Sequence, residues 1–265
     1  MATTTLNAIT IDYDDHGAGG AAVLLVHGHP FNRSMWSPQV AALAAAGWRV
    51  IVPDLRGYGG TAVVPGMTTL DVFARDLVAL LDHLRIDQVV AAGLSMGGQI
   101  VMELARLYPH RLRGVVLAAT YPQAETEEGK GRRREMAARL EREGMAGYAA
   151  EVLPQMLSAG TIAAAPGTAA QVMAMMRGTS PQGAAAALRG RAERPDYAAT
   201  LARLAVPALI VIGDEDVFTS RADADRMQAL IAGSELVWMA GVGHMPNLER
   251  PDAFNQALVR FLAET

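Results

Sequence analysis

Short apolar runs alternate along the chain with stretches in which apolar residues recur every three or four positions. The short runs are typical of strands buried on both faces, and the periodic stretches are typical of amphipathic helices. The predicted strands are Ala21–His27, Arg49–Pro53, Gln88–Leu94, Arg113–Ala119, Val206–Gly213 and Glu235–Ala240. The predicted helices are Ser37–Ala46, Thr69–Leu84, Met96–Tyr108, Ala222–Ala232 and Pro251–Leu262. Strands and helices in alternation predict a parallel sheet covered by helices.

Two segments depart from this alternation. Leu6–Tyr13 alternates apolar and polar residues and is followed by Asp14–Gly20, which predicts one added antiparallel edge strand closed by a turn. Residues 121–204 carry no convincing strand, and they hold the charge cluster Glu125–Arg142 and several prolines. We therefore expect residues 121–204 to form an inserted helical cap, and residues 1–120 and 205–265 to form one core domain.

Composition and charge narrow the function classes. Lys plus Arg number 23 against 27 Asp plus Glu, and the net charge of −4 makes nucleic-acid binding a poor expectation. The absence of cysteine excludes disulfides, thiolate metal sites and cysteine catalysis. The N-terminus lacks the pattern of a signal peptide, and apolar runs such as Val89–Leu94 are far shorter than the ~20 residues that span a bilayer. We expect a cytoplasmic protein with no membrane partner.

The strongest chemical signal is Gly93-Leu94-Ser95-Met96-Gly97-Gly98. It is a G-x-S-x-G pattern between a predicted strand and a predicted helix, where a nucleophilic serine stands on a sharp turn that needs small neighbours. The helix start also offers unpaired N–H groups to an anionic intermediate. The alternative is a glycine-rich turn with an N-capping serine, and partners for the serine decide between the two interpretations.

Partners for Ser95 follow in the sequence. A serine hydroxyl needs a base to take its proton and an acid to orient that base. His244 follows the last predicted strand, and Asp214, Glu215 and Asp216 follow the strand before it. All of these residues stand at carboxyl ends of strands, where parallel sheets bind ligands. The order serine, acid, histidine is the order found in α/β-hydrolases.

These motifs resemble the α/β-hydrolase superfamily over essentially the full length of the chain. Besides the serine elbow, the resemblance rests on His27-Gly28-His29-Pro30, Asp54-Leu55-Arg56-Gly57-Tyr58-Gly59, Gly213–Asp216, and Gly243-His244 with Glu249-Arg250-Pro251. The chain is most similar to small capped serine esterases, 3-oxoadipate enol-lactonases and the cofactor-free haloperoxidase and perhydrolase group. The resemblance implies an α/β-hydrolase fold, with a mostly parallel eight-stranded sheet flanked by helices and an inserted helical cap.

The resemblance also implies roles for individual residues. It places a catalytic triad at Ser95, Asp216 and His244, with the acid three residues after the glycine that ends its strand. It places the oxyanion hole at the backbone N–H groups of His29 and Met96. The family usually has an aromatic or other apolar residue where this chain has His29.

Nearby polar residues have structural interpretations. We expect His27 to hold the oxyanion loop, Asp54 and Arg56 to form structural ion pairs or loop bonds, and Glu249 to shape the start of the last helix. The arginine run 132–134 is flanked by acids, which favours a solvated face. None of the remaining histidines has a carboxylate at ligand spacing, so no metal is expected.

The nucleophile type indicates the reaction. Haloalkane dehalogenases and epoxide hydrolases of this fold carry aspartate at the elbow, whereas Ser95 predicts hydrolysis of carboxylic esters or lactones through an acyl-enzyme without a cofactor. Enol-lactones and acyl-homoserine lactones are candidate substrates, and the oligomeric state stays open. Thioethers suit an adaptable apolar pocket, so the candidate substrate-binding residues of the cap are Met136, Met156, Met173 and Met176, with plain core packing as the alternative. A C–C bond hydrolase, hydroxynitrile lyase or perhydrolase on the same triad, or a ligand-binding receptor, are the competing functions.

Overall fold

The computed structural model describes residues 1–17 and 20–265 and contains one eight-stranded sheet, in the order β1-β2-β4-β3-β5-β6-β7-β8. The strands are β1 (Ala2–Leu6), β2 (Ile9–His16), β3 (Ala22–Val26), β4 (Arg49–Pro53), β5 (Val89–Leu94), β6 (Leu112–Ala118), β7 (Ala208–Gly213) and β8 (Glu235–Met239). Strand β2 pairs antiparallel with β1 and β4, and all other pairs are parallel. The predicted mostly parallel eight-stranded sheet is confirmed.

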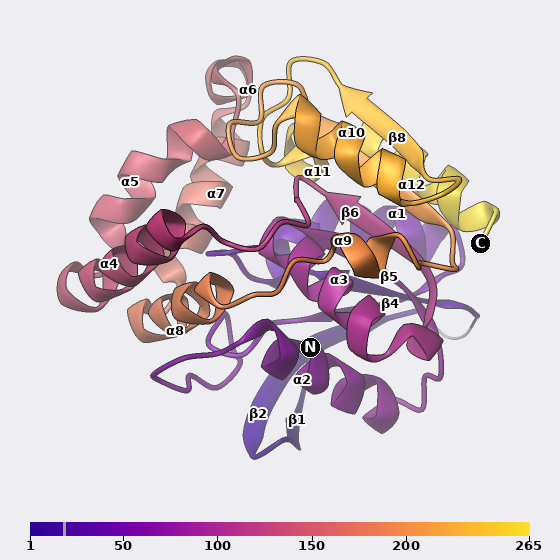
Figure 1. Cartoon of the computed structure of the whole chain (residues 1–265), viewed down its shortest axis with the longest axis horizontal. Coiled ribbons are helices and arrows are strands. Elements are labelled where there is room, and N and C mark those ends of the chain that lie inside the picture. The colour runs from indigo at the N-terminus through magenta and orange to yellow at the C-terminus, as the bar shows by residue number, and fades with distance from the viewer. Residues whose placement is uncertain (18–19) are drawn as a thin grey trace.

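Helices cover both faces of this sheet (Figure 1). On one face lie α1 (Ser37–Ala45), α11 (Pro246–Glu249) and α12 (Pro251–Ala263), and on the other lie α2 (Leu70–His83), α3 (Met96–Leu107) and α10 (Arg221–Leu230). Short 3₁₀ turns occur at Arg33–Trp36 and Pro109–Arg111. Along β3, Val23 and Leu25 pack into one core cluster, and Leu24 and Val26 pack into the other. Successive side chains of a strand point to opposite faces, so a run buried on both sides has to be apolar throughout.

The prediction of one antiparallel edge strand over Leu6–Tyr13 is right for residues 9–13, which lie in β2, and wrong in its extent, because a further strand, β1, forms the edge. Strands β1 and β2 form a hairpin in which Leu6 pairs with Ile9. The turn residues Asn7 and Ala8 have φ of 50° and 61°, the left-handed conformation of a two-residue hairpin turn. Alanine gives no sequence signal for that conformation, which is why the turn was missed. The predicted closing segment Asp14–Gly20 is strand as far as His16, and its Ala18 and Gly19 lie outside the described residues.

Residues 121–204 contain six helices and no strand, all within the described part of the chain. They are α4 (Glu127–Glu143), α5 (Met145–Met156), α6 (Ala159–Ala164), α7 (Pro166–Gly178), α8 (Pro181–Ala192) and α9 (Ala198–Leu201). Helices α4 to α8 gather on one side of the molecule, whereas α9 packs on α3 and α10 (Figure 1). The last residues of the predicted cap therefore lie against the core helices, and a separate cap domain stays a prediction.

Hydrogen bonds join helices α5 to α8 to the rest of the fold. The Thr179 hydroxyl donates to the carbonyl of Pro30 at 2.8 Å, and the Thr68 N–H donates to the carbonyl of Ala186 at 3.0 Å. At the joint between α5 and α6, the Ser158 N–H donates to Glu249 at 2.9 Å. These three hydrogen bonds connect separate positions of the α5–α8 segment to the rest of the fold.

Candidate active site

Ser95 stands where β5 passes into α3, with φ 56° and ψ −115°. This backbone conformation is strained for a residue other than glycine and persists only where the surroundings enforce it. A Cβ on Gly93 would lie 2.2 Å from the Gly97 carbonyl oxygen, and a Cβ on Gly97 would lie 2.1 Å from that of Val26. The two glycines therefore permit the sharp turn, and the strand–turn–helix setting predicted for Ser95 is confirmed.

His244 and Asp216 come from loops that follow neighbouring strands and meet in the interior. Nδ1 of His244 lies 3.0 and 2.9 Å from the two carboxylate oxygens of Asp216, and the two side chains are 3% and 0% exposed. Oδ1 of Asp216 also accepts a hydrogen bond from the Phe218 N–H at 2.8 Å. Burial raises the pKa of Asp216, but His244 and the N–H groups of Phe218 and Thr219 outweigh it, so this pKa lies below its usual value. A carboxylate thus faces the imidazole.

The other two acids of this loop do not face His244. Asp214 is exposed and accepts hydrogen bonds from the N–H groups of Gly241 at 2.7 Å and Val242 at 3.4 Å. Glu215 is exposed and makes no side-chain hydrogen bond or ion pair with any described residue. The geometry pairs the histidine with Asp216, and the catalytic roles of Ser95, Asp216 and His244 stay predictions.

The loop after β3 runs beside the serine. A Cβ on Gly28 would lie 2.9 Å from the Leu94 carbonyl oxygen and 3.3 Å from the Cβ of Ser95, so a glycine lets the loop pass this closely. Within the described chain, no hydrogen bond is donated by the main-chain N–H of His29. Met96 opens α3, where the first N–H groups have no acceptor within the helix. Both N–H groups of the predicted oxyanion hole are therefore without a main-chain partner.

The side chains of His27 and His29 have different tasks. Nδ1 of His27 lies 2.9 Å from the carbonyl of Gly28, and its Nε2 accepts from the Leu55 N–H at 3.0 Å, so His27 holds the loop as predicted. Nδ1 of His29 lies 2.8 Å from the Tyr58 hydroxyl, and its buried Nε2 has no hydrogen-bond partner among the described residues. Burial, and next the charge of Arg191, keeps the pKa of His29 well below its usual value. The imidazole of His29 is neutral at pH 7.

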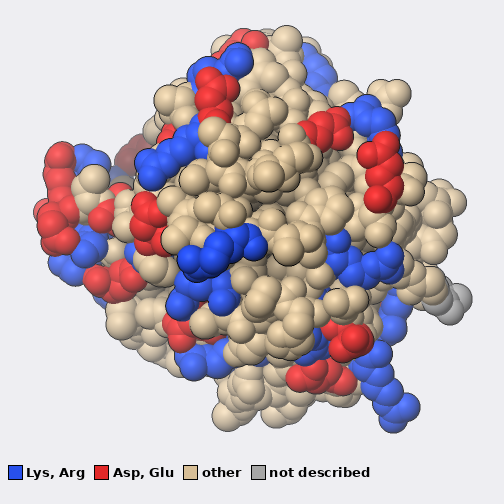
Figure 2. Space-filling view, turned by 45° about the vertical axis from the view of Figure 1, so that its right-hand side comes forward, with Lys and Arg blue, Asp and Glu red and all other residues tan. Residues whose placement is uncertain are grey.

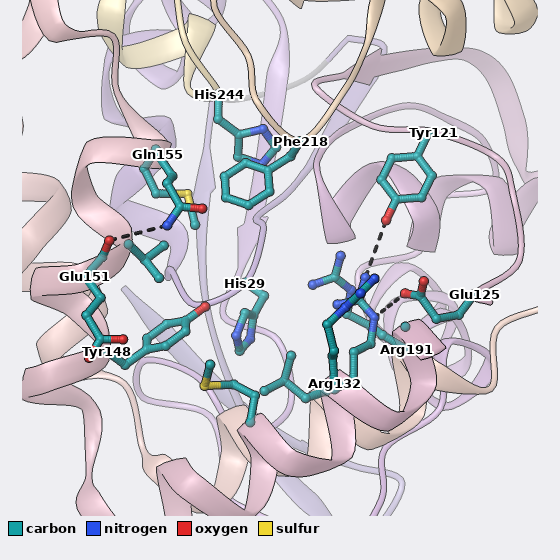
Figure 3. A pocket seen from close by; sticks show the side chains of 16 residues that line it. His29, Tyr121, Glu125, Arg132, Tyr148, Glu151, Gln155, Arg191, Phe218 and His244 are labelled. Atoms are coloured by element: carbon teal, nitrogen blue, oxygen red, sulfur yellow. Dashed lines mark hydrogen bonds and ion pairs between the residues drawn. The ribbon is translucent and has the colours of Figure 1, made fainter. Parts of the chain in front are cut away.

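A cavity of about 440 Å³ lies against His29 and His244. Figure 3 shows Arg132 and Arg191 on one side of it and Tyr148 and Gln155 on the opposite side, with His29 between them. The lining residues are His29, Tyr121, Glu125, Gly129, Arg132, Arg133, Met136, Tyr148, Glu151, Val152, Gln155, Met156, Leu188, Arg191, Phe218 and His244. Ser95 is not in this set, but the loop beside it reaches the cavity through His29. The cavity thus adjoins the predicted triad and is walled mainly by α4, α5 and α8.

Two of the four candidate methionines reach this cavity. Met136 and Met156 line it. Met176 is fully buried in the core, and the partly buried Met173 packs against that core, so neither lines the cavity. For Met173 and Met176 the expectation is not supported, because helical spacing alone does not tell which face of α7 meets the core. Substrate contact by Met136 and Met156 stays a prediction.

The arginines show what the sequence interpretation missed. The expectation of a solvated face is right for Arg134, which is 57% exposed and pairs with Glu193, and wrong for Arg133, which is 18% exposed and lines the cavity. Arg133 shares a helix face with Gly129, Ala137 and Leu140, which are buried, and this periodicity was an available signal. No pattern in the sequence singles out Arg191, which also lines the cavity.

Other polar residues near the site are structural. Asp54 pairs with Arg33, and Arg56 pairs with Asp76 at 2.8 Å, so the expected ion pairs are confirmed. Glu249 does more than begin a helix: one oxygen accepts from the Ser158 N–H at 2.9 Å and the other accepts from the Met245 N–H at 3.2 Å. It joins the α5–α6 segment to the loop that carries His244.

Metal-binding groups, membrane-spanning helices and surface charges were the remaining features relevant to possible partners. Within residues 1–17 and 20–265, no group of three or more His, Asp or Glu is arranged to hold a metal ion. No helix of the described chain has the length and apolar character needed to cross a membrane. Figure 2 shows acidic and basic side chains interspersed at the α4 end of the molecule, where Arg139 pairs with Glu143 at 2.8 Å. The absence of nucleic-acid and membrane partners stays a prediction.

Comparison with known proteins gives a consistent assignment. Residues 23–257 match the model of the alpha/beta hydrolase family. The chain is 30% identical to 3-oxoadipate enol-lactonase 2 of Acinetobacter baylyi over 97% of this chain and 94% of that protein. A thermophilic esterase from Thermogutta terrifontis, solved with malate bound, superposes with a TM-score of 0.94 at 37% identity, covering 99% of this chain and 96% of that one. The enol-lactonase from Burkholderia xenovorans LB400 superposes with a TM-score of 0.92 at 29% identity, covering 99% and 100%. The chain belongs to the alpha/beta hydrolase family.

Proposed function

We propose that this carboxylic ester hydrolase cleaves esters or lactones through an acyl-enzyme intermediate on Ser95. One observation carries the proposal: the strained Ser95 elbow and the buried His244–Asp216 pair stand at carboxyl ends of the sheet, and His244 and His29, from the loop beside Ser95, line one cavity. The esterase and enol-lactonase likenesses give the same reaction class. No cofactor is required, because acyl transfer to a serine and then to water needs only a base and an oxyanion site.

The arrangement supports the following steps. Ser95 Oγ attacks the acyl carbon while Nε2 of His244 takes the hydroxyl proton, and Asp216 holds the Nδ1–H and stabilises the imidazolium. The carbonyl oxygen becomes an oxyanion and accepts hydrogen bonds from the N–H groups of His29 and Met96. The carbon–oxygen bond to the leaving group then breaks, and His244 returns the proton to the leaving alkoxide.

The acyl-enzyme is released by water. His244 removes a proton from the water as its oxygen attacks the acyl carbon, and the proton passes to Ser95 Oγ as the acyl bond breaks. An ester yields an acid and an alcohol, a lactone yields a single hydroxy acid, and an enol-lactone yields an enol acid that tautomerises to an oxo acid. The panel that identifies the substrate therefore includes both esters and lactones at several chain lengths, enol-lactones and acyl-homoserine lactones among them.

Replacing Ser95 with alanine tests the proposal. With a chromogenic acetate ester, Ser95→Ala is expected to lower kcat by about 10⁴-fold or more, because the triad acts as a unit. The wild type is expected to release an initial burst of alcohol as it acylates, which distinguishes a hydrolase from a receptor that binds without turnover. Wild-type rates in a folded Ser95→Ala variant, checked by circular dichroism and thermal unfolding, would contradict the proposal.

A further inference from the structure

Arg133 and Arg191 line the cavity, and the carboxylate of Glu125, which also lines it, pairs with Arg133 and with the buried Arg194. Arg133 and Arg194 both pair with the same oxygen of Glu125, the latter at 3.1 Å, and their side chains are 18% and 0% exposed. Burial raises the pKa of Glu125, but Arg133 and then Arg194 outweigh it, so this pKa lies below its usual value and the group is ionised. Both arginines contact Oε2 of Glu125, and the third, Arg191, forms no ion pair with either oxygen of this carboxylate.

Arg191 is buried without a carboxylate partner. The residue is 7% exposed, and its Nε donates to Oε1 of Gln99 at 3.2 Å. Across the described residues it forms no ion pair, and its two terminal nitrogens make no hydrogen bond. The two terminal nitrogens are not fully buried, and Arg191 lines the cavity, so their N–H groups are open to it. A guanidinium fork with free N–H donors thus faces the space beside His29.

The charge balance favours an anion in this space. Burial lowers the pKa of Arg191 to about 9, and the charge of Arg133 acts in the same direction, so Arg191 is still cationic at pH 7. A buried charge without a partner is destabilising, and a ligand of opposite charge offsets that destabilisation. The two acids of the lining pair with other arginines, Glu125 with Arg133 and Arg194 and Glu151 with Arg139, and neither pairs with Arg191.

We infer that Arg191 binds a carboxylate of the substrate, so that the preferred esters or lactones carry an ionised carboxyl group besides the one cleaved. A single planar fork matches the two oxygens of a carboxylate in a bidentate pair. The opposite wall holds Tyr148 (Figure 3), and Val152 of the same helix α5 also lines the cavity, so α5 offers apolar surface to the hydrocarbon part of the acyl chain. The inference rests on the proposed function, because it names the substrate class of that same site.

Matched esters test the inference. The probes are p-nitrophenyl half-esters of straight-chain dicarboxylic acids with four to six carbons, each compared with the ester that ends in a neutral carboxamide of the same size. Spontaneous hydrolysis is subtracted. For the wild type we expect kcat/KM to favour the carboxylate ester by about 10- to 100-fold at the best chain length, the range of a charge-assisted hydrogen bond.

Variants at one position separate charge from fold. Arg191→Gln is expected to reduce the carboxylate-to-carboxamide ratio to about 1, and Arg191→Lys is expected to keep part of it, because the charge remains and the fork is lost. The matched control is Arg134→Gln, since Arg134 is exposed and pairs with Glu193 outside the cavity. It is expected to leave the ratio unchanged.

The outcomes distinguish this inference from the proposed function. If the wild type hydrolyses the carboxamide esters through Ser95 but does not prefer the carboxylate esters at any length, the inference fails and the proposed function stands. An equal loss on both esters in Arg191→Gln also overturns it. If Ser95-dependent hydrolysis of both series is absent, the proposed function fails. Should Arg191→Gln not fold, the wild-type ratio and its decrease in Arg191→Lys decide.

Discussion

Replacing Asp216 with asparagine should trap His244 in the wrong tautomer. Oδ1 of Asp216 accepts from the Phe218 N–H at 2.8 Å, so the amide oxygen of an asparagine has to stay in that place. The amide NH₂ then takes the place of Oδ2, 2.9 Å from Nδ1 of His244. The amide oxygen at the Oδ1 position, 3.0 Å from Nδ1, is a weaker acceptor than a carboxylate, and the NH₂ beside it repels an Nδ1–H, so the imidazole proton is favoured on Nε2. With Nε2 protonated, His244 cannot accept the hydroxyl proton of Ser95.

The expected loss is large because the fold fixes both neighbours of the amide. A triad with the wrong histidine tautomer loses about 10⁴ in kcat, which corresponds to about 5.4 kcal/mol of transition-state stabilisation at about 1.36 kcal/mol for each factor of ten. Volume and burial are unchanged, so the variant should fold. Steady-state kinetics on a chromogenic ester, with unfolding curves to confirm the fold, measure the effect.

Asp214→Asn is the matched control. It makes the same chemical change two residues away, on an exposed carboxylate that accepts from the Gly241 N–H at 2.7 Å. We expect kcat to change by less than about 3-fold, since the side chain does not face His244, and stability to fall by about 1 kcal/mol for the weakened hydrogen bond. The reverse ranking of the two folded variants would refute the assignment of Asp216 and give its role to Asp214.

Three further predictions concern the loop, the buried histidines and the elbow. His29→Phe should keep kcat/KM within about 10-fold, because the main-chain N–H remains; complete loss in a folded variant would show that the imidazole takes part. Burial lowers the pKa of both His27 and His29 in the folded state, so the unfolded chain binds more protons and the free energy of unfolding should fall as pH drops below about 6.5, by up to about 1.36 kcal/mol per pH unit for each histidine. Urea unfolding between pH 7.5 and 5.5 measures how the free energy of unfolding changes with pH. In His29→Phe this slope should be smaller by the contribution of one histidine, up to about 1.36 kcal/mol per pH unit. An unchanged slope would contradict the burial of His29 as its cause. Gly97→Ala places a Cβ 2.1 Å from the Val26 carbonyl oxygen and should destabilise by about 3 kcal/mol or more, whereas Gly131→Ala in α4, with open space around it, should stabilise by up to about 1 kcal/mol; equal melting temperatures would refute the steric argument.

Local patterns were sufficient for the sheet and the elbow. The apolar runs identify the inner strands because both faces of each are covered, and Ser95 is recognisable because strand, small residues and helix have to follow one another in the chain. The hairpin turn was not recognisable, because Ala8 adopts its left-handed conformation under the constraint of the β1–β2 pairing rather than by its own preference.

The cavity wall could be predicted only in part. The Asp216–His244 pair depends on two loops whose relation is set by neighbouring strands, so the family resemblance supplied what local patterns left open. Arg191 pairs with no acid close in sequence, and its surroundings come from α3 and α4, so spacing carries no signal of its place. For Met173 and Met176, apolar residues at helical spacing are expected whether that face of α7 packs on the core or lines the cavity, so the spacing does not distinguish the two.

The carboxylate of Glu249 has a consequence for how the pocket of such an enzyme can diversify. It holds the N–H groups of Ser158 and Met245 together, and the N–H of His244 donates to the carbonyl of Met156 at 3.2 Å. These hydrogen bonds hold the end of α5 and the loop that carries His244 in a fixed relation. Insertions or deletions at the α5–α6 joint that reshape the acyl pocket also displace the imidazole of His244. Changes of substrate specificity at this joint therefore lower the catalytic rate. Helices α4 and α8 have no hydrogen bond to that loop in the described chain, so they are the segments in which the pocket can vary while the rate is kept.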